Sequence, residues 1–298
     1  MTDSVTVTAA TAPNLEIQAA NGVRYRYRRF GTVTADRPPM VFLQHFRGNL
    51  DNWDPALIDA IAAQHEVILL DNTGVAGSSG RVPTSVGQMA RDALEFLDAL
   101  GVRRYDLFGF SLGGFVAQEI ALLRPTAVRA LVLAGTGPAG APRMHGWRED
   151  IRRESHHDQS TAESLLYIFF AHTDTSRELG KAFLGRIFAR QVDRDEPTTT
   201  AVRDAQYDAV LDWGIPDLSK LERLRGIVQP TLILQGDDDL MIPTPGSHLM
   251  AGLIPDSRLH IFPDAAHASI FQYPEEAAGI VRGFLAEVET AGTPSAGR

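Results

Sequence analysis

The sequence of 298 residues contains no cysteine. This absence excludes disulfide bonds, a thiol nucleophile and a zinc site built on thiolates. It also fits a reducing compartment, so we expect a cytoplasmic protein. The sequence has no run of 18 apolar residues, which argues against a membrane-spanning helix. The first 14 residues lack a basic stretch followed by an apolar one, so we expect no signal peptide.

The sequence also has no excess of positively charged residues. The chain carries 37 acidic and 28 basic residues, which gives a formal net charge of −9. This balance argues against nucleic acid or an anionic membrane surface as the main partner. It does not distinguish a monomer from a homodimer.

Short apolar segments are abundant, and turn residues bound them. Their length and composition are typical of strands that are buried on both faces of a parallel sheet. A segment with alternating tyrosine and arginine precedes them and predicts a half-exposed strand. The predicted strands are 23–30, 40–44, 66–71, 105–110, 128–135, 230–236 and 258–262.

Helical patterns lie between these strands, at 85–100, 112–124 and 275–287. Strands that alternate with helices predict an α/β fold with a mostly parallel sheet. The alternation stops over 138–222, where charged helical segments replace the apolar runs, so we expect a helical insertion between two strands of one sheet. The core is then formed by 1–137 and 223–298. We expect disorder after about residue 289.

The segment 108–114 reads FGFSLGG and places Ser111 between a predicted buried strand and a predicted helix. So sharp a reversal brings the backbone two residues before the serine close to the backbone that follows it. Glycine at 109, 113 and 114 removes the Cβ atoms that would clash there. The turn therefore presents the Ser111 hydroxyl at a helix N-terminus, as in the G-x-S-x-G nucleophile elbow.

A serine hydroxyl needs a base to act as a nucleophile at neutral pH. Of nine histidines, His267 is the best candidate, because it follows the last predicted strand and so reaches the same edge of the sheet as Ser111. The base in turn needs a carboxylate that orients it. Three candidates, Asp237, Asp238 and Asp239, follow the strand at 230–236.

From about residue 15 to 288 the chain resembles the α/β-hydrolase superfamily, in the branch of serine hydrolases with a helical lid. The resemblance implies an eight-stranded, mostly parallel sheet with flanking helices and an inserted helical cap. The acid of that family follows its strand in the pattern G-x-x-D-x-x-x-P, which runs here from Gly236 to Pro243 and points to Asp239. Some members carry the acid one strand earlier, but 131–140 contains no carboxylate.

The resemblance also implies an oxyanion hole made of two backbone amides. One is that of Leu112, which follows the nucleophile. The other follows a His-Gly pair in relatives, and this sequence has Gln44 and His45 in that place when Trp53 is kept in register. The second amide is then that of Phe46, and His45 brings a second imidazole to the mouth of the site. If His45 itself occupies the usual histidine position, the second amide of the oxyanion hole is supplied by the residue one position later in the chain.

These residues imply acyl transfer without a metal or an organic cofactor, most simply the hydrolysis of a small-molecule carboxylic ester or lactone. The apolar residues of the insertion suggest a pocket for a hydrophobic group. Two alternatives share the same residues, a C–C bond hydrolase of dienol diketones and a cofactor-free perhydrolase of the haloperoxidase type. A third is a ligand-binding protein of this fold without catalytic activity. The expected substrate-binding residues are His45, Trp147, Tyr167 and Phe170.

Overall fold

A computed structural model describes residues 7–292, in which eight strands form one sheet in the order β1-β2-β4-β3-β5-β6-β7-β8. Strands β3 to β8 run parallel to one another, whereas β2 is antiparallel to both β4 and β1. This confirms the predicted α/β class and the mostly parallel sheet. The strands are β1 (Leu15–Gln18), β2 (Arg24–Gly31), β3 (Met40–Leu43), β4 (Glu66–Leu70), β5 (Tyr105–Phe110), β6 (Val128–Ala134), β7 (Thr231–Gly236) and β8 (Ser257–Phe262).

The central strands are buried along their whole length, as their apolar composition predicts. Every residue of β3, β5 and β7 is buried, since helices cover both faces of the sheet. The strand absent from the sequence prediction is β1, whose residues are alternately half-buried and exposed. It is an edge strand of four residues, and its pattern is too short to stand out from a loop.

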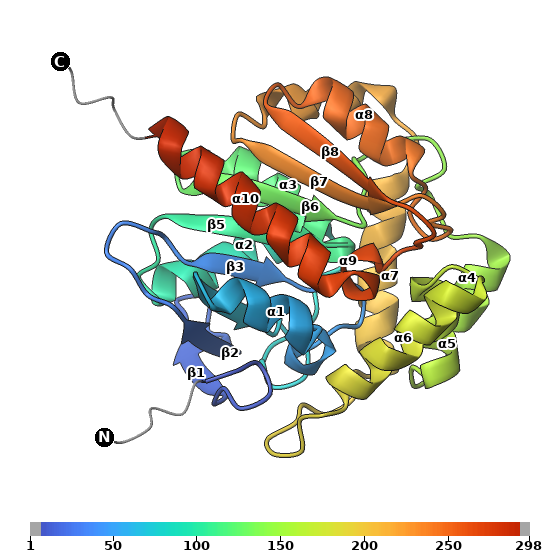
Figure 1. The fold of residues 1–298 in the computed structure, drawn as a ribbon, viewed down its shortest axis with the longest axis horizontal. Coiled ribbons are helices and arrows are strands. Elements are labelled where there is room, and N and C mark those ends of the chain that lie inside the picture. The colour runs from blue at the N-terminus through green and yellow to red at the C-terminus, as the bar shows by residue number, and fades with distance from the viewer. Residues whose placement is uncertain (1–6, 293–298) are drawn as a thin grey trace.

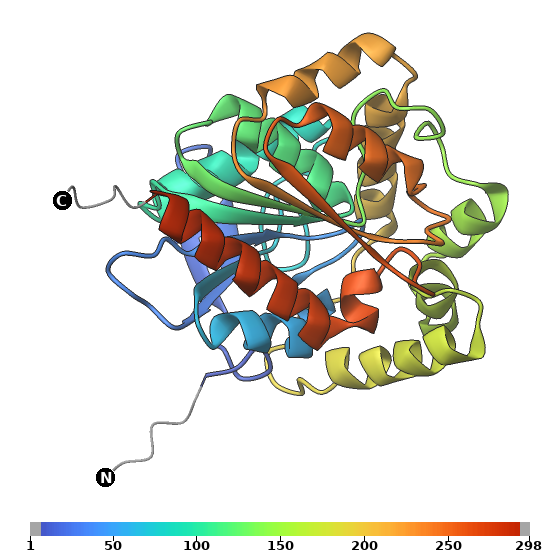
Figure 2. The same ribbon diagram turned by 45° about the horizontal axis from the view of Figure 1, so that its top comes forward.

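Helices pack on the two faces of the sheet (Figures 1 and 2). The helices α1 and α10 contact each other and cover one face, while α2 and α3 contact each other on the opposite face. The helix α10 extends to Gly292, past its predicted end, so the disorder expected from residue 289 is wrong as far as 292, and 293–298 lie outside the described residues. The core helices are α1 (Pro55–Ala62), α2 (Val86–Ala99), α3 (Leu112–Leu123), α8 (Pro245–Leu253), α9 (Ser269–Gln272) and α10 (Pro274–Gly292), with 3₁₀ helices at Leu50–Asn52 (η1) and Leu218–Gly226 (η2).

Four α-helices are inserted between β6 and β7, ahead of η2, and we call these four helices the cap. The described chain between these two strands contains helices and loops but no strand, as predicted for the insertion. The cap lies over the edge where the parallel strands end (Figure 2). Its helices are α4 (Glu149–Ser155), α5 (Ala162–Phe169), α6 (Asp174–Ile187) and α7 (Thr200–Gly214).

Helix α6 of the cap is fixed to the core by one arginine. The Arg186 guanidinium donates to both carboxylate oxygens of Asp54, with its closest contact at 2.6 Å, and Asp54 is the N-cap residue of α1. It also donates to the carbonyl oxygen of Phe271 in α9 at 3.0 Å. Asp54 is fully buried, so this charge-assisted contact holds α6 on two core helices at once.

None of the helices within residues 7–292 combines the length and the apolar composition needed to cross a bilayer.

Candidate active site

Ser111 occupies a strained turn between β5 and α3. Its backbone has φ 55° and ψ −119°, in the left-handed half of φ that a residue with a side chain seldom adopts. Two hydrogen bonds hold it there: the Ser111 amide donates to the Ala134 carbonyl at 2.9 Å, and the Thr136 hydroxyl donates to the Ser111 carbonyl at 2.9 Å. The end of β6 therefore fixes the turn that presents the serine hydroxyl.

Neighbouring glycines make this turn possible for steric reasons. A Cβ atom at Gly109 would overlap the backbone of Gly113, and one at Gly113 would overlap the carbonyl oxygen of Leu43 at the end of β3. A Cβ atom at Gly114 would collide with the Thr136 side chain. The crowding that the sequence predicts around the serine is thus present, and it extends to the neighbouring strands.

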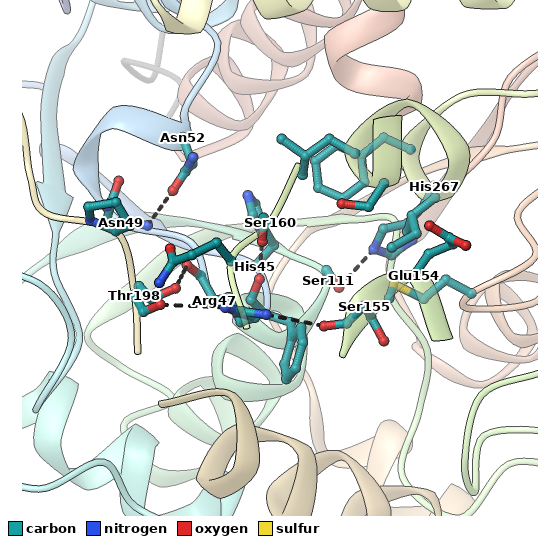
Figure 3. A pocket seen from close by; sticks show the side chains of 18 of the residues that line it. His45, Arg47, Asn49, Asn52, Ser111, Glu154, Ser155, Ser160, Thr198 and His267 are labelled. Carbon is teal, nitrogen blue, oxygen red and sulfur yellow. Dashed lines mark hydrogen bonds between the residues drawn. The ribbon is translucent and has the colours of Figure 1, made fainter. Parts of the chain in front are cut away.

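The predicted serine, histidine and acid form one chain of hydrogen bonds. The Ser111 Oγ atom lies 2.9 Å from Nε2 of His267, and Nδ1 of His267 lies 2.8 Å from Oδ2 of Asp239 (Figure 3 shows the first contact). All three side chains are buried. Because the carboxylate can only accept, Nδ1 carries the proton, and the lone pair of Nε2 faces the serine hydroxyl.

The Asp239 carboxylate is oriented by several donors. Its Oδ1 atom accepts from the backbone amides of Met241 at 2.8 Å and Ile242 at 2.9 Å. Its Oδ2 atom accepts from the Gln235 side chain at 2.9 Å in addition to His267. These bonds leave the carboxylate a single orientation, directed at the imidazole.

The other two carboxylates of this acidic turn have different surroundings. Both oxygens of Asp237 accept backbone amides, of Asp264 at 3.1 Å and Ala265 at 3.0 Å, which shapes the loop that carries His267. The Asp238 side chain is exposed and makes no hydrogen bond or ion pair among the described residues. Of the three candidates, Asp239 alone contacts the imidazole.

The two backbone amides predicted for the oxyanion hole have no acceptor among the described residues. The Leu112 amide is at the first position of α3, where no intrahelical acceptor exists. In the described part of the chain the Phe46 amide has no acceptor either, whereas the next amide, that of Arg47, donates to Oε1 of Gln206 in α7 at 2.6 Å. The amide that the alternative register would use is therefore already engaged with the cap.

His45 lines the cavity above Ser111 with a fixed ring. Its Nδ1 atom lies 2.8 Å from the Phe46 carbonyl oxygen, and the ring packs edge-on against Phe110 and Phe169. Since a carbonyl can only accept, Nδ1 carries the proton, and Nε2 keeps a lone pair without a partner in residues 7–292. Burial lowers the pKa of His45 from 6.5 to about 4, so the ring is neutral at neutral pH.

The cavity between the cap and the core has a volume of about 540 Å³ (Figure 3). It meets solvent where its lining residues are exposed, at Gln159, Ser160, Phe188 and Pro197. Its lining from the core is His45, Phe46, Arg47, Asn49, Asn52, Ser111, Met241 and His267, and its lining from the cap is Glu154, Ser155, Gln159, Ser160, Ser164, Leu165, Ile168, Phe169, Phe188, Arg194, Asp195, Pro197 and Thr198.

Three of the four residues expected to bind substrate are not among those lining this cavity. Trp147 packs edge-on against Phe46, behind the cavity wall. The Tyr167 hydroxyl donates to Asp150 on the outer side of the cap at 3.0 Å, and the Phe170 ring is buried against Phe183. The apolar stripe of α5 does face inward, but Leu165, Ile168 and Phe169 are its cavity-lining members.

Several polar residues of the site were missed by the sequence analysis. Arg47 has φ 61° and directs its guanidinium into the cap, where it donates to the carbonyls of His157 at 2.6 Å and Asp158 at 2.7 Å. The loop before α7 adds Asp195 and Thr198 to the lining. Arg47 lies in the segment QHFRGNLDNW, which the sequence analysis already placed at the site, so this residue could have been predicted. The loop before α7 has no periodic pattern, so nothing in the sequence indicates Asp195 or Thr198.

No three His, Asp or Glu side chains come together among residues 7–292 in an arrangement that could hold a metal ion. The site offers a hydroxyl in contact with one imidazole nitrogen, a carboxylate in contact with the other, and the unpaired amide of the residue that follows the hydroxyl.

Comparison with known proteins identifies the family of the chain. The model of the alpha/beta hydrolase fold family matches residues 38–274. The chain belongs to the α/β-hydrolase family. Among solved structures, an alpha/beta hydrolase fold protein from Chitinophaga pinensis is 38% identical with a TM-score of 0.88, over 94% of this chain and 99% of that one.

Two known proteins are similar to the chain over most of their length. The protein named “Putative carbamate hydrolase RutD” of Stutzerimonas stutzeri is 29% identical over 265 residues, 88% of this chain and 96% of that protein. The poly(3-hydroxyalkanoate) depolymerase of Ectopseudomonas oleovorans is 30% identical over 266 residues, 85% of this chain and 88% of that protein.

Proposed function

We propose that this α/β-hydrolase is a serine hydrolase that cleaves a small carboxylic ester or lactone through an acyl-enzyme. The observation that carries the proposal is the hydrogen-bonded chain from Ser111 through His267 to Asp239, at the floor of a cavity large enough for a small organic molecule. Membership of the family supports it, as does the similarity to a poly(3-hydroxyalkanoate) depolymerase, since a polyhydroxyalkanoate is a polyester.

The proposed reaction has two steps. In the first, Nε2 of His267 takes the proton of Ser111 while Oγ attacks the carbonyl carbon, and the C–O bond to the alcohol breaks after His267 returns the proton to the leaving oxygen. In the second, His267 takes a proton from water, the resulting hydroxide attacks the acyl carbon, and Ser111 leaves with the proton. Asp239 keeps the imidazole in the required tautomer and stabilises its charged form.

The negative charge on the carbonyl oxygen needs donors that are already in place. The amides of Leu112 and Phe46 are free and flank Ser111 in this proposal, so they form the oxyanion hole. His45 lines the same cavity, and its buried Nε2 atom has no partner among the described residues, so we expect this side chain to contact the substrate.

The test is turnover of a substrate panel by the purified protein and by Ser111→Ala. The panel contains aryl esters, lactones, a carbamate and a vinylogous diketone, and a separate assay measures peracid formation. Together they distinguish ester hydrolysis from C–C cleavage and from perhydrolysis. We expect ester or lactone turnover by the wild type and a loss of about 10⁴-fold or more in Ser111→Ala.

A fluorophosphonate probe provides a second, substrate-independent readout. We expect it to label Ser111, as shown by mass spectrometry of the modified peptide, and to leave Ser111→Ala unlabelled. Full activity in Ser111→Ala would overturn the mechanism. Absence of labelling in the folded wild type would favour the ligand-binding alternative.

A further inference from the structure

The backbone of Arg47 has a conformation that a residue with a side chain seldom adopts. The Gly48 amide donates to the His45 carbonyl at 3.0 Å and closes a turn, with Phe46 and Arg47 at its two central positions. Arg47 has φ 61°, and glycine or asparagine is usual where the second central residue of a turn has a positive φ. An arginine at such a position indicates that its side chain is needed there.

The Arg47 guanidinium binds two separate connections of the cap. Its Nη1 atom donates to the carbonyl oxygens of Ser155 at 3.3 Å and His157 at 2.6 Å. Its Nη2 atom donates to those of Asp158 at 2.7 Å and Thr198 at 3.4 Å. The first three residues belong to the end of α4 and the chain that leads to α5, whereas Thr198 lies between α6 and α7 (Figure 3). One side chain therefore fixes both connections.

These bonds make Arg47 an anchor and leave it no donor for a substrate. Each terminal nitrogen has two N–H groups and two carbonyl acceptors, so both nitrogens are fully used. The remaining donor, Nε, is buried. Burial lowers the pKa of the guanidinium, and the charge of Arg203 lowers it further, so this cation depends on the carbonyls for its solvation. Separation of the cap from Arg47 would leave a buried charge without acceptors, which is costly.

The peptide groups of Arg47 are bound to the cap as well. The amide donates to Oε1 of Gln206 in α7 at 2.6 Å, and the carbonyl accepts from the Thr198 hydroxyl at 3.1 Å. The cap thus contacts Arg47 through its side chain and through both of its peptide groups. Since a hydrogen bond closes the turn, a change in the Arg47 backbone also reorients the other central residue, Phe46, whose amide is the proposed oxyanion donor.

The connections bound by Arg47 also form part of the rim of the cavity. Some of their lining residues are exposed where the cavity meets solvent, and others are buried beside Arg47. These lining residues are Ser155, Gln159, Ser160, Pro197 and Thr198. Arg47 therefore connects the rim, where the cavity meets solvent, with the turn that carries the proposed oxyanion donor.

We propose that Arg47 is a positioning residue that couples the cap to the oxyanion hole. Its guanidinium holds the two cap connections, and its constrained backbone keeps the Phe46 amide directed at the oxyanion. This inference rests on the proposed function, because it names the residue that places the second oxyanion donor of the same site. Fast turnover then requires that both connections stay bound to Arg47.

The first test compares the wild type with Arg47→Gly and Arg47→Met in ester hydrolysis. Glycine relieves the strain of φ 61° and removes the anchor, whereas methionine removes only the guanidinium. We expect both variants to lose about tenfold to a hundredfold in kcat with a smaller change in KM, since the oxyanion donor acts in the transition state. A wild-type kcat in either variant, or a loss confined to KM, would overturn the inference.

Arg190→Met is the matched control. Arg190 is also buried but does not line the described cavity. Its Nη1 atom donates to the carbonyl oxygens of Ala9, Ala10 and Ala12. The substitution removes a buried guanidinium with similar acceptors, so stability should fall while kcat keeps its wild-type value. Equal losses of kcat in Arg190→Met and Arg47→Met would indicate a general effect of lost stability and contradict the inference.

A transition-state analogue gives a readout that a purely structural role would not change. A trifluoromethyl ketone adds to Oγ of Ser111 and places an oxyanion in the hole, whereas the matched methyl ketone binds with its carbonyl intact. We expect Arg47→Gly to lose affinity for the first compound by about the same factor as kcat and to keep its affinity for the second. Equal losses for the two compounds would contradict the positioning of the oxyanion donor.

Hydrogen exchange separates this inference from the proposed function, because it needs no turnover. In Arg47→Gly we expect faster exchange in 155–160 and 196–200, which are remote from residue 47 in the sequence. In Thr198→Val, which removes the hydroxyl bond to the Arg47 carbonyl, we expect faster exchange in 44–50. Thr198→Val alone decides the matter if Arg47→Gly does not fold. These results in a protein that hydrolyses no ester would retain the coupling and reject the reaction. Ester turnover with wild-type exchange in both variants would do the opposite.

Discussion

The backbone amide of Arg47 lies 2.6 Å from Oε1 of Gln206 and donates a hydrogen bond to it across the boundary between the core and the cap. Arg47 follows Phe46, whose own amide is the proposed second oxyanion donor. The position of that donor therefore depends on helix α7, although α7 contributes no residue to the lining of the described cavity.

Replacing the acceptor tests this dependence. Gln206→Leu leaves the buried Arg47 amide without a partner, and we expect the free energy of unfolding to fall by about 1–3 kcal/mol. We also expect kcat to fall about tenfold with a smaller change in KM, because the oxyanion donor acts in the transition state. The exposed Asp208→Asn on the same helix is the matched control. An unchanged kcat would show that α7 does not position the donor.

The three consecutive aspartates after β7 should differ sharply in their effects. Asp239→Asn removes the carboxylate from His267, and we expect kcat to fall about 10⁴-fold. Asp237→Ala releases the amides of the His267 loop, so we expect a loss of about tenfold in kcat together with lower stability. Asp238→Ala, at an exposed position, should change neither quantity. Equal effects of the three substitutions on kcat and thermal unfolding would contradict the assignment.

The buried neutral ring of His45 should make stability depend on pH. Its pKa is about 4 in the folded protein and about 6.5 when unfolded, so the unfolded chain binds the extra proton between these values. The free energy of unfolding should therefore decrease as the pH falls from about 6.5 to about 4, and this group contributes about 3 kcal/mol to the decrease.

His45→Phe keeps an aromatic ring at the same position and removes the titration. Urea unfolding at a series of pH values should show that the difference between wild type and variant changes by about this amount over the window. His248→Phe, at an exposed position, serves as the surface control. Parallel stability curves for wild type and His45→Phe would contradict the prediction.

Crowding at the nucleophile turn predicts opposite outcomes for two glycine substitutions. Gly113→Ala places a methyl group against the Leu43 carbonyl and should lower the free energy of unfolding by about 3 kcal/mol. Gly279→Ala, in the interior of α10 with open space around it, should raise that energy by about 0.5–1 kcal/mol. Thermal unfolding of both variants checks this, and a well-folded, fully stable Gly113→Ala would disprove the steric explanation.

The central strands of the sheet and the hydrogen-bonded residues Ser111, Asp239 and His267 were predictable because each depends on a short, recognisable sequence pattern. Fully buried strands require apolar runs, and the turn at Ser111 requires glycines at fixed positions. Parallel strands end at one edge, so residues after β5, β7 and β8 were expected to meet there, as Ser111, Asp239 and His267 do.

The lining of the cavity was only partly predictable. An apolar stripe such as 165–170 shows that a helix has a buried side, but not which of its buried residues face a ligand and which face another helix. Phe169 faces the cavity, whereas Phe170, one residue further, packs on Phe183. Asp195 lies in an irregular loop, where no periodicity reports burial.

The anchoring of α6 through Arg186 has a consequence for how molecules reach Ser111. Tilting α6 outward would break its bonds to Asp54 and to Phe271, within a few residues of His267. The cavity meets solvent without such a movement at exposed lining residues, among them Gln159 and Ser160. Since the chain has no native thiol, a single cysteine introduced at Ser160 would attach a fluorophore at this rim of the cavity and at no other residue, where it would sense an occupied cavity.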